Sequence, residues 1–208
     1  MNNEQEFIQG YYISNNKITD DLIKYFEKSK DKREGVSSNG VDKSIKDSTD
    51  INIHPERAKF FEAFTNYFDQ LKNCLEIYKK KYKFVYKYTS EWRINDNFNI
   101  QKYLPHQAYH QWHCERGNLE TSDRHLVFMT YLNDVQEGGE TEWYYQKLKV
   151  KPEKGLTFLW PCDWTFTHKG YSPINENKYI ITGWYHFTKW GLKIIFWMMF
   201  ILIFYIKN

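Results

Sequence analysis

The sequence predicts a mainly β protein with flanking α-helices, in which two antiparallel sheets pack as a jelly-roll barrel. Eight short segments with strand-like composition follow one another from about residue 84, and turn residues separate them. Aromatic residues make up 19% of the 208 residues, and runs rich in Val, Phe, Tyr and Trp suit a packed β-core. A chain of this length is sufficient for one domain and a tail.

Residues 1–83 are expected to form a helical region that supports the barrel. Residues 5–14 predict a short edge strand, and Thr19 can cap a helix that runs to about Lys28. Residues 29–54 are charged and polar and predict a loop. Its segment KDSTD, residues 46–50, either reaches toward a functional site or, as is more common, lies on the surface.

Pro55 is expected to begin a long helix. Its apolar residues recur at steps of three and four, which makes one continuous stripe: Phe61, Phe64, Phe68, Leu71, Leu75 and Tyr78. We expect this stripe to pack on a sheet as part of the core, without a chemical role.

The barrel itself is expected over residues 84–188. Its strands are predicted at 84–88, 98–103, 109–114, 125–132, 140–145, 155–160, 165–168 and 178–187. Gly138 and Gly139 mark a turn before the strand that carries Glu140 and Thr141. We interpret this glycine pair as a hairpin turn and nothing more.

Four residues of the barrel predict its chemistry. His113 and Glu115, in QWHCERG, are two positions apart, so on a strand their side chains share one face and can bind one metal ion. His168 completes a set of two histidines and one carboxylate, which leaves three metal positions open for substrate atoms and dioxygen. Lys178, ten residues further, supplies a positive charge for an anionic cosubstrate.

The order of these residues resembles the prolyl 4-hydroxylase-like branch of the Fe(II)/2-oxoglutarate-dependent dioxygenases. The resemblance covers residues 98–187 and rests on RHLVFMTYLNDVQEGGETEWYYQ (124–146), VKPEKGLTFLWP (150–161) and KYIITGWYHF (178–187). That branch usually has aspartate where this chain has Glu115, whose extra methylene must fold back to keep the metal distance. The resemblance implies a double-stranded β-helix, the cupin-like form of the jelly roll, with the metal at one open end.

The resemblance also implies the reaction. Fe(II) would be held by the two histidines and the glutamate, and 2-oxoglutarate would pair its distal carboxylate with Lys178. Tyr131 and Tyr103 would lie near this cosubstrate, and Trp184 would line the cavity wall. Dioxygen and 2-oxoglutarate would be converted to succinate and carbon dioxide as the substrate is hydroxylated. L-ascorbate is implied as the reductant of oxidised iron.

The substrate implied by the resemblance is a prolyl residue in a peptide or protein, and a small molecule or another side chain stays open. Two interpretations without activity are a binding module on the same fold and a membrane-tethered interaction protein. Succinate formation from 2-oxoglutarate distinguishes these from an enzyme. A zinc site with Cys114 and Cys162 is a further alternative, but Cys114 faces away from its two neighbours on a strand.

Composition excludes several other classes of protein. The net charge of +3 is too small to predict a nucleic-acid partner. Three cysteines show no disulfide spacing, and the polar start MNNEQEFIQG is no signal peptide. We therefore expect a cytoplasmic catalytic domain, where Fe(II) and 2-oxoglutarate are available.

Residues 189–208 are expected to form a separate hydrophobic segment. Ile194 to Ile206 are unbroken apolar residues, about 20 Å as a helix, which is short of a usual span. Extension back to Trp190, with the charge of Lys193 at the headgroups, gives about 25 Å. We interpret this segment as a membrane anchor, a C-terminal transmembrane helix. The alternative is a terminal helix that packs on the protein or on a partner.

Overall fold

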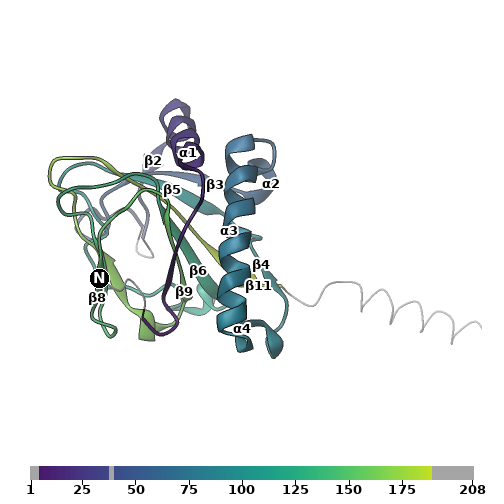
Figure 1. Cartoon of the computed structure of the whole chain (residues 1–208). Helices are drawn as coiled ribbons and strands as arrows, with labels where there is room; N and C mark the ends of the chain where they lie inside the picture. The colour runs from purple at the N-terminus through teal and green to yellow at the C-terminus, as the bar shows by residue number, and fades with distance from the viewer. Residues whose placement is uncertain (1–4, 38–39, 189–208) are drawn as a thin grey trace, which may run out of the picture.

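Two antiparallel sheets form the body of the structure, a computed structural model that describes residues 5–37 and 40–188 (Figure 1). The larger sheet contains, in spatial order, β1 (Gln9–Tyr12), β9 (Leu156–Pro161), β6 (Arg124–Tyr131), β11 (Lys178–Phe187), β5 (Phe98–Tyr103), β3 (Thr49–Ile53) and β2 (Arg33–Glu34), while the short β4 (Trp92–Arg93) pairs with β11. The smaller sheet contains β10 (His168–Gly170), β7 (Thr141–Trp143) and β8 (Leu148–Val150). The predicted mainly β architecture is confirmed, and it fits a jelly roll.

The helices cover one face of the larger sheet (Figure 1). They are α1 (Asn16–Lys28), α2 (Pro55–Ala58), α3 (Glu62–Lys81) and α4 (Phe84–Lys87), and two short 3-10 turns are η1 (Leu119–Thr121) and η2 (Trp164–Phe166). The apolar stripe of α3 packs with α1 and the sheet in one buried cluster, as predicted. Phe61, which was predicted as part of this stripe, precedes α3 and is 36% exposed. Burial of such side chains stabilises the fold by roughly 1.5–3 kcal/mol each.

The space between the two sheets holds a second apolar cluster. Strand β6 contributes to both clusters because its side chains alternate: Leu126 and Phe128 face the helices, whereas Val127 and Met129 face the smaller sheet. Trp143 of β7 packs against Phe158 and Trp160 of β9, with ring centroids 5.3 Å apart in each pair. This second cluster supports the floor of the site described below.

Four predicted elements differ from the structure. Of residues 165–168, predicted as a strand, the first two belong to the 3-10 turn η2, and the strand β10 begins only at His168. Of residues 84–88, predicted as a strand, the first four form α4, and Phe84 stacks on Tyr88, the residue that follows this helix. Residues 109–114, predicted as a strand, form a loop whose contacts are isolated bridges. The region 29–54, predicted as a loop, contains β3, in which Asp50 and Asn52 alternate with Ile51 and Ile53 in the period of two that is typical of a strand.

Two helix starts also differ. Asn15, and not Thr19, caps α1, because the Asn15 side chain accepts from the backbone N–H of Lys17. Pro55 begins the short α2, and α3 starts separately at Glu62.

The larger sheet draws strands from both sides of the boundary predicted at residue 84. β1 pairs with β9 and β3 pairs with β5, so the first 83 residues supply strands as well as helices. In the part of the chain that the structure describes, we find no helix with the length and apolar character needed to cross a membrane. The predicted C-terminal anchor, residues 189–208, lies outside the described residues.

Candidate metal and cosubstrate site

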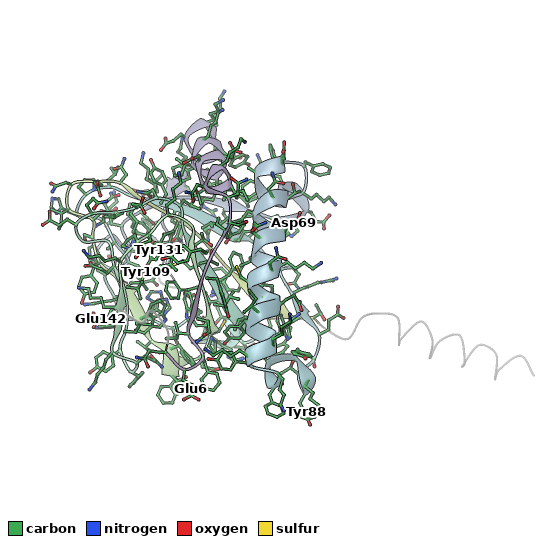
Figure 2. The ribbon with its side chains drawn as sticks, in the orientation of Figure 1. Glu6, Asp69, Tyr88, Tyr109, Tyr131 and Glu142 are labelled. Atoms are coloured by element: carbon green, nitrogen blue, oxygen red, sulfur yellow. The ribbon has the colours of Figure 1, made fainter. Side chains whose placement is uncertain are left out.

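A cavity of about 600 Å³ opens between the two sheets. Its walls come from β3, β5, β6, β7, β9, β10 and β11 and from the loop that joins β5 to β6. Figure 2 labels Tyr109 of that loop and Tyr131 of β6 within the barrel. The four residues predicted to carry the chemistry, His113, Glu115, His168 and Lys178, all line this one cavity.

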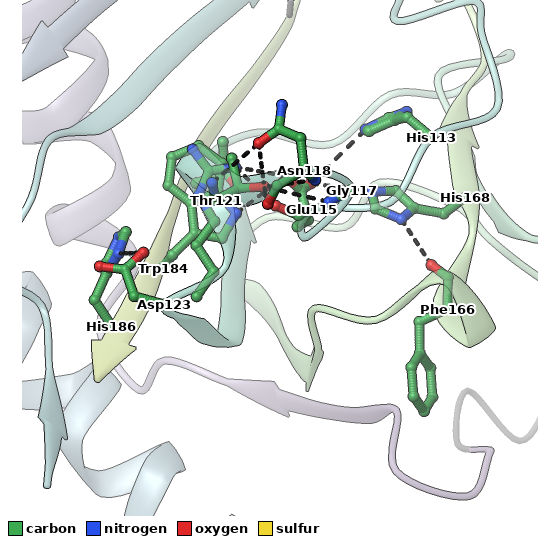
Figure 3. A network of polar contacts seen from close by, with 12 residues as sticks. His113, Glu115, Gly117, Asn118, Thr121, Asp123, Phe166, His168, Trp184 and His186 are labelled. Atoms are coloured by element: carbon green, nitrogen blue, oxygen red, sulfur yellow. Dashed lines mark hydrogen bonds and ion pairs between the residues drawn. The ribbon is translucent and has the colours of Figure 1, made fainter. Parts of the chain in front are cut away.

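The two histidines and the glutamate predicted as metal ligands converge in the cavity (Figure 3). His113 and His168 face each other because their backbones exchange hydrogen bonds of 3.0 and 2.9 Å. Glu115 Oε1 lies 3.7 Å from His113 Nε2 and 3.3 Å from His168 Nε2. Their ligand atoms all lie within 4.8 Å of one another, and this is the only such group among the described residues. Cys114 and Cys162, the zinc alternative, do not belong to it.

Neighbouring groups orient these three side chains. The Nδ1 atoms of His113 and His168 lie 3.0 Å from the carbonyl oxygens of Gln111 and Phe166, so each ring donates there and presents Nε2 to the cavity. Trp184 Nε1 donates to Glu115 Oε2 at 3.0 Å. Such supporting contacts fix the tautomer and the direction of a metal ligand.

Burial and charge set the protonation states that a metal requires. Burial, with the neighbouring His168, lowers the pKa of His113 to about 4. Burial alone would raise the pKa of Glu115, but His168, His113 and Arg124 together outweigh it and lower that pKa to about 2. Neutral pH therefore gives a neutral imidazole at His113 and a carboxylate at Glu115, which are the forms that bind Fe(II).

Lys178 lies at the buried end of the cavity and is only 3% exposed. Its ammonium donates to the carbonyl of Gly139 at 3.0 Å and lies 4.8 Å from the centroid of the Tyr103 ring. Burial lowers the pKa of Lys178 to about 8, against the opposing effect of Glu140. The interpretation of Gly138 and Gly139 as a turn alone is therefore incomplete, because Gly139 also holds this lysine.

The two predicted cosubstrate tyrosines occupy different positions. Tyr103 lines the cavity and donates to Gln101 Oε1 at 2.8 Å. Tyr131 is fully buried behind the wall, where its hydroxyl donates to Thr141 Oγ1 at 2.6 Å. Thr141 itself lines the cavity. The sequence reasoning missed Thr141, although its place two residues before the buried Trp143 indicates the inward face of β7.

Other cavity residues were also missed. Arg124 lies 3.6 Å from the centroid of the Trp184 ring and donates to the backbone oxygen of Glu115 at 2.9 Å. Tyr109 stacks on His113 with ring centroids 3.7 Å apart. The segment KDSTD does not lie on the surface, because Lys46, Ser48 and Asp50 are buried and two of them line the cavity.

Comparison with known proteins agrees with this geometry. Residues 98–186 match the sequence model of the 2OG-Fe(II) oxygenase superfamily. No curated protein sequence matches the chain.

Solved structures share the fold. The viral collagen prolyl hydroxylase vCPH from Paramecium Bursaria Chlorella virus-1, in complex with 2OG, is 17% identical with a TM-score of 0.63, over 88% of this chain and 97% of that one. A prolyl-4-hydroxylase from Pseudomonas putida is 14% identical with a TM-score of 0.65, over 88% and 94%. A prolyl hydroxylase from Trichoplax adhaerens, in complex with a peptide fragment of the hypoxia inducible factor oxygen degradation domain, is 16% identical with a TM-score of 0.66, over 86% and 83%.

Proposed function

We propose that this 2OG-Fe(II) oxygenase, whose superfamily is identified through residues 98–186, hydroxylates prolyl residues in a peptide or protein. One observation carries the proposal: two histidines and one carboxylate face a cavity whose buried end holds a lysine. This arrangement provides a metal site with open positions and a fixed cation for a dicarboxylate, which are the two requirements of a 2-oxoglutarate-dependent dioxygenase.

The proposed metal ligands are His113, Glu115 and His168. When bound there, Fe(II) supplies the chemistry that couples oxidation of 2-oxoglutarate by dioxygen to hydroxylation of the substrate. Trp184 holds the carboxylate of Glu115 in place through its indole N–H. Arg124 covers the Trp184 ring and keeps a positive charge 3.7 Å from Glu115 Oε2, which favours the ionised carboxylate.

The proposed cosubstrate site lies at the buried end of the cavity. Lys178 has one hydrogen-bond partner among the described residues, so its remaining N–H donors can bind the distal carboxylate of 2-oxoglutarate. Thr141 Oγ1 accepts from Tyr131, which leaves the Thr141 proton free to donate to the same carboxylate. Tyr103 packs beside the ammonium, which lies 4.8 Å from the centroid of its ring. We propose L-ascorbate as the reductant that maintains Fe(II).

The choice of a prolyl substrate is supported by the solved structures of the same fold, three of which are described as prolyl hydroxylases. One of them was determined with a peptide. A cavity open to solvent and lined with polar groups at its mouth suits such a substrate.

The proposal is tested by mass spectrometry of a prolyl peptide library after incubation with Fe(II), 2-oxoglutarate and ascorbate. We expect products with one added oxygen atom, together with succinate. His168→Ala should abolish both, Glu115→Asp should keep part of the activity, and His110→Ala, an exposed histidine, serves as the matched control.

Lys178→Ala should weaken 2-oxoglutarate binding by roughly 2–3 kcal/mol, the scale of a lost hydrogen bond to a charged group. Succinate without peptide oxidation would mean a different substrate. No succinate under any condition would contradict the enzymatic function and favour a binding module.

A further inference from the structure

One wall of the cavity is polar although it belongs to a sheet with an apolar core. Strands β3 and β5 are paired, and their alternate side chains Ile51, Ile53, Phe98 and Ile100 pack against the helices. The intervening side chains line the cavity, and all four are polar: Asp50, Asn52, Asn99 and Gln101. We call these four residues the polar wall. None of them belongs to the metal ligands or contacts Lys178 through a hydrogen bond among the described residues.

The polar wall is organised by strand register. Asp50 lies opposite Gln101, and Asn52 lies opposite Asn99. Asn52 Nδ2 donates to Asn99 Oδ1 at 3.0 Å, and Gln101 Nε2 lies 3.4 Å from Asp50 Oδ2. Two cross-strand polar pairs therefore follow each other along the wall.

A buried ion pair extends the wall toward the metal site. Lys46 Nζ donates to Asp50 Oδ2 at 2.6 Å, and both side chains are only 5% exposed. Ser48 Oγ donates to the other oxygen of Asp50 at 2.8 Å. The ammonium also lies 6.0 Å from the centroid of the Tyr109 ring, which stacks on His113. The Tyr109 ring therefore lies beside both the ion pair and His113.

Stability alone does not explain this polar wall. Apolar residues of similar size in place of a buried ion pair are often neutral or stabilising, so the pair is weak evidence for a structural role. Elsewhere in the same sheet, Met129 of β6 and Trp160 of β9 line the cavity with apolar side chains, so this sheet does not require a polar lining. A polar wall in a cavity is instead what a polar ligand requires.

Several groups of the wall have unused hydrogen-bonding capacity. Within residues 5–37 and 40–188, Asp50 is the only hydrogen-bond partner of Lys46 Nζ, so the ammonium can donate further. In the same part of the chain Asn99 Nδ2 donates to no group, and Asn52 Oδ1 accepts from none. The wall thus offers both donors and acceptors to the cavity.

Spacing and charge indicate which ligand fits. Successive polar pairs are two residues apart on a strand, about 6.6 Å, which is also the repeat of an extended polypeptide. Lys46 and Asp50 neutralise each other's charge. A carboxylate ligand would therefore be repelled by Asp50, and a cationic ligand would be repelled by Lys46. A neutral group that both donates and accepts avoids both penalties, and a peptide group has this chemistry.

We propose that the polar wall and Lys46 form a subsite that binds the main chain of an extended, uncharged polypeptide segment beside the residue that is hydroxylated. This inference rests on the proposed function and deepens it, because it assigns recognition to peptide groups of the substrate. It also implies tolerance of different side chains around the target, since the main chain is common to all of them.

The test measures binding of an uncharged peptide of alternating proline, alanine and serine, labelled with a net-neutral BODIPY dye, by fluorescence anisotropy, with the full chain and without turnover. The double variant Asn52→Leu/Asn99→Leu keeps side-chain size and removes the amide groups. We expect its Kd for the peptide to rise about tenfold, the effect of losing one to two neutral hydrogen bonds. Binding of 2-oxoglutarate should be unchanged.

Two controls keep the result interpretable. Asn66→Leu/Asn73→Leu makes the same chemical change on the exposed side of α3 and should bind the peptide like the parent. The same peptide with N-methylated alanine and serine lacks main-chain N–H donors, and should bind the parent chain more weakly without any change in the protein.

Four outcomes would overturn the subsite. Equal peptide affinity of the parent and the polar-wall variant would remove these asparagines from recognition. Equal affinity for the N-methylated peptide would exclude main-chain N–H groups, and tighter binding of an acidic version would exclude a neutral ligand. A parent chain that binds no prolyl peptide but forms succinate would refute both this subsite and the prolyl substrate, while the oxygenase activity would stand.

Discussion

The charge of Lys178 depends on where the fold places this residue. Burial disfavours its ammonium, while Glu140 favours it, and the net result is a pKa of about 8. The groups nearest to the ammonium are the Gly139 carbonyl and the Tyr103 ring, and neither titrates near neutral pH. The charge of the cation at the proposed cosubstrate site therefore changes near pH 8.

We predict that 2-oxoglutarate binding weakens as pH rises through about 8. Only the ammonium form of Lys178 binds the carboxylate well, and its fraction falls about tenfold between pH 7 and pH 9, so the apparent Kd should rise about tenfold. Titration with a redox-inert divalent metal in the site measures this. Lys178→Arg stays charged and should flatten the profile. The same slope in the arginine variant would place the titrating group elsewhere.

Trp184 illustrates how a cavity residue acts on the metal through another side chain. Its indole N–H donates to Glu115 Oε2, and its ring lies beneath Arg124. Trp184→Phe keeps an aromatic ring there but removes the donor. We predict about tenfold weaker metal binding, since loss of a supporting contact to a metal ligand costs 10- to 100-fold.

Competition of Co(II) between the protein and a coloured chelator measures the metal affinity of Trp184→Phe. Trp164→Phe, an exposed tryptophan, is the matched control and should leave this affinity unchanged. A Trp184→Phe variant with parental metal affinity would show that the indole does not orient Glu115.

At the scale of elements, the connection that precedes β7 contributes both to the stability of the fold and to the proposed cosubstrate site. Gly138 and Gly139 both have positive φ, +75° and +76°. The backbone N–H of Gly139 donates to Ser172 and its carbonyl accepts from Lys178. A Cβ on Gly138 would overlap the backbone oxygen of Ser172. A substitution there must therefore displace the backbone that holds Lys178.

We predict that Gly138→Ala destabilises the fold by about 1–3 kcal/mol, the range for residues forced into sparsely populated backbone conformations, and also weakens 2-oxoglutarate binding. Urea unfolding and a 2-oxoglutarate titration measure the two effects. Gly40→Ala is the matched control, because Gly40 has φ +89° but open space around its Cα. If both variants lost the same stability, the contact with Ser172 would have no role.

The helices and strands also show how much of the fold could be predicted from the sequence. The long apolar stripe of α3 and strands such as β5 and β11 follow from local periodicity and were predicted. The residues proposed as metal ligands followed from spacing and resemblance. The polar face of β3 could not be predicted, because only its pairing with β5, about 50 residues away, turns Asp50 and Asn52 toward the cavity.

Local composition also led to wrong predictions where tertiary packing determines the structure. The sequence FVYKY, residues 84–88, has the aromatic and β-branched residues of a strand, yet it continues from the end of α3 as the helix α4. Thr141 was missed as a cavity residue because its role depends on the smaller sheet facing the larger one, a relation that no short segment contains.

At the scale of the whole molecule, the N-terminal region is part of the structure that positions the site. More than half of the buried cluster between helices and sheet comes from the first 83 residues, with Leu22, Phe26 and Phe64 among its fully buried members. β3 covers the edge of β5, and β1 covers the edge of β9. The polar wall itself exists only because β3 joins the sheet.

We predict that residues 84–188 alone do not fold, whereas residues 5–188 do. The shorter fragment exposes two sheet edges and the apolar face that α1 and α3 cover, and exposed edges of this kind pair with other chains. The longer fragment keeps every described contact of β11, whose last residue Phe187 pairs with Trp92. Urea unfolding followed by circular dichroism should therefore give one cooperative transition for residues 5–188 and none for residues 84–188. A cooperative transition in the shorter fragment would make the barrel an independent unit, and the strands that build the polar wall would then be additions to a fold complete without them.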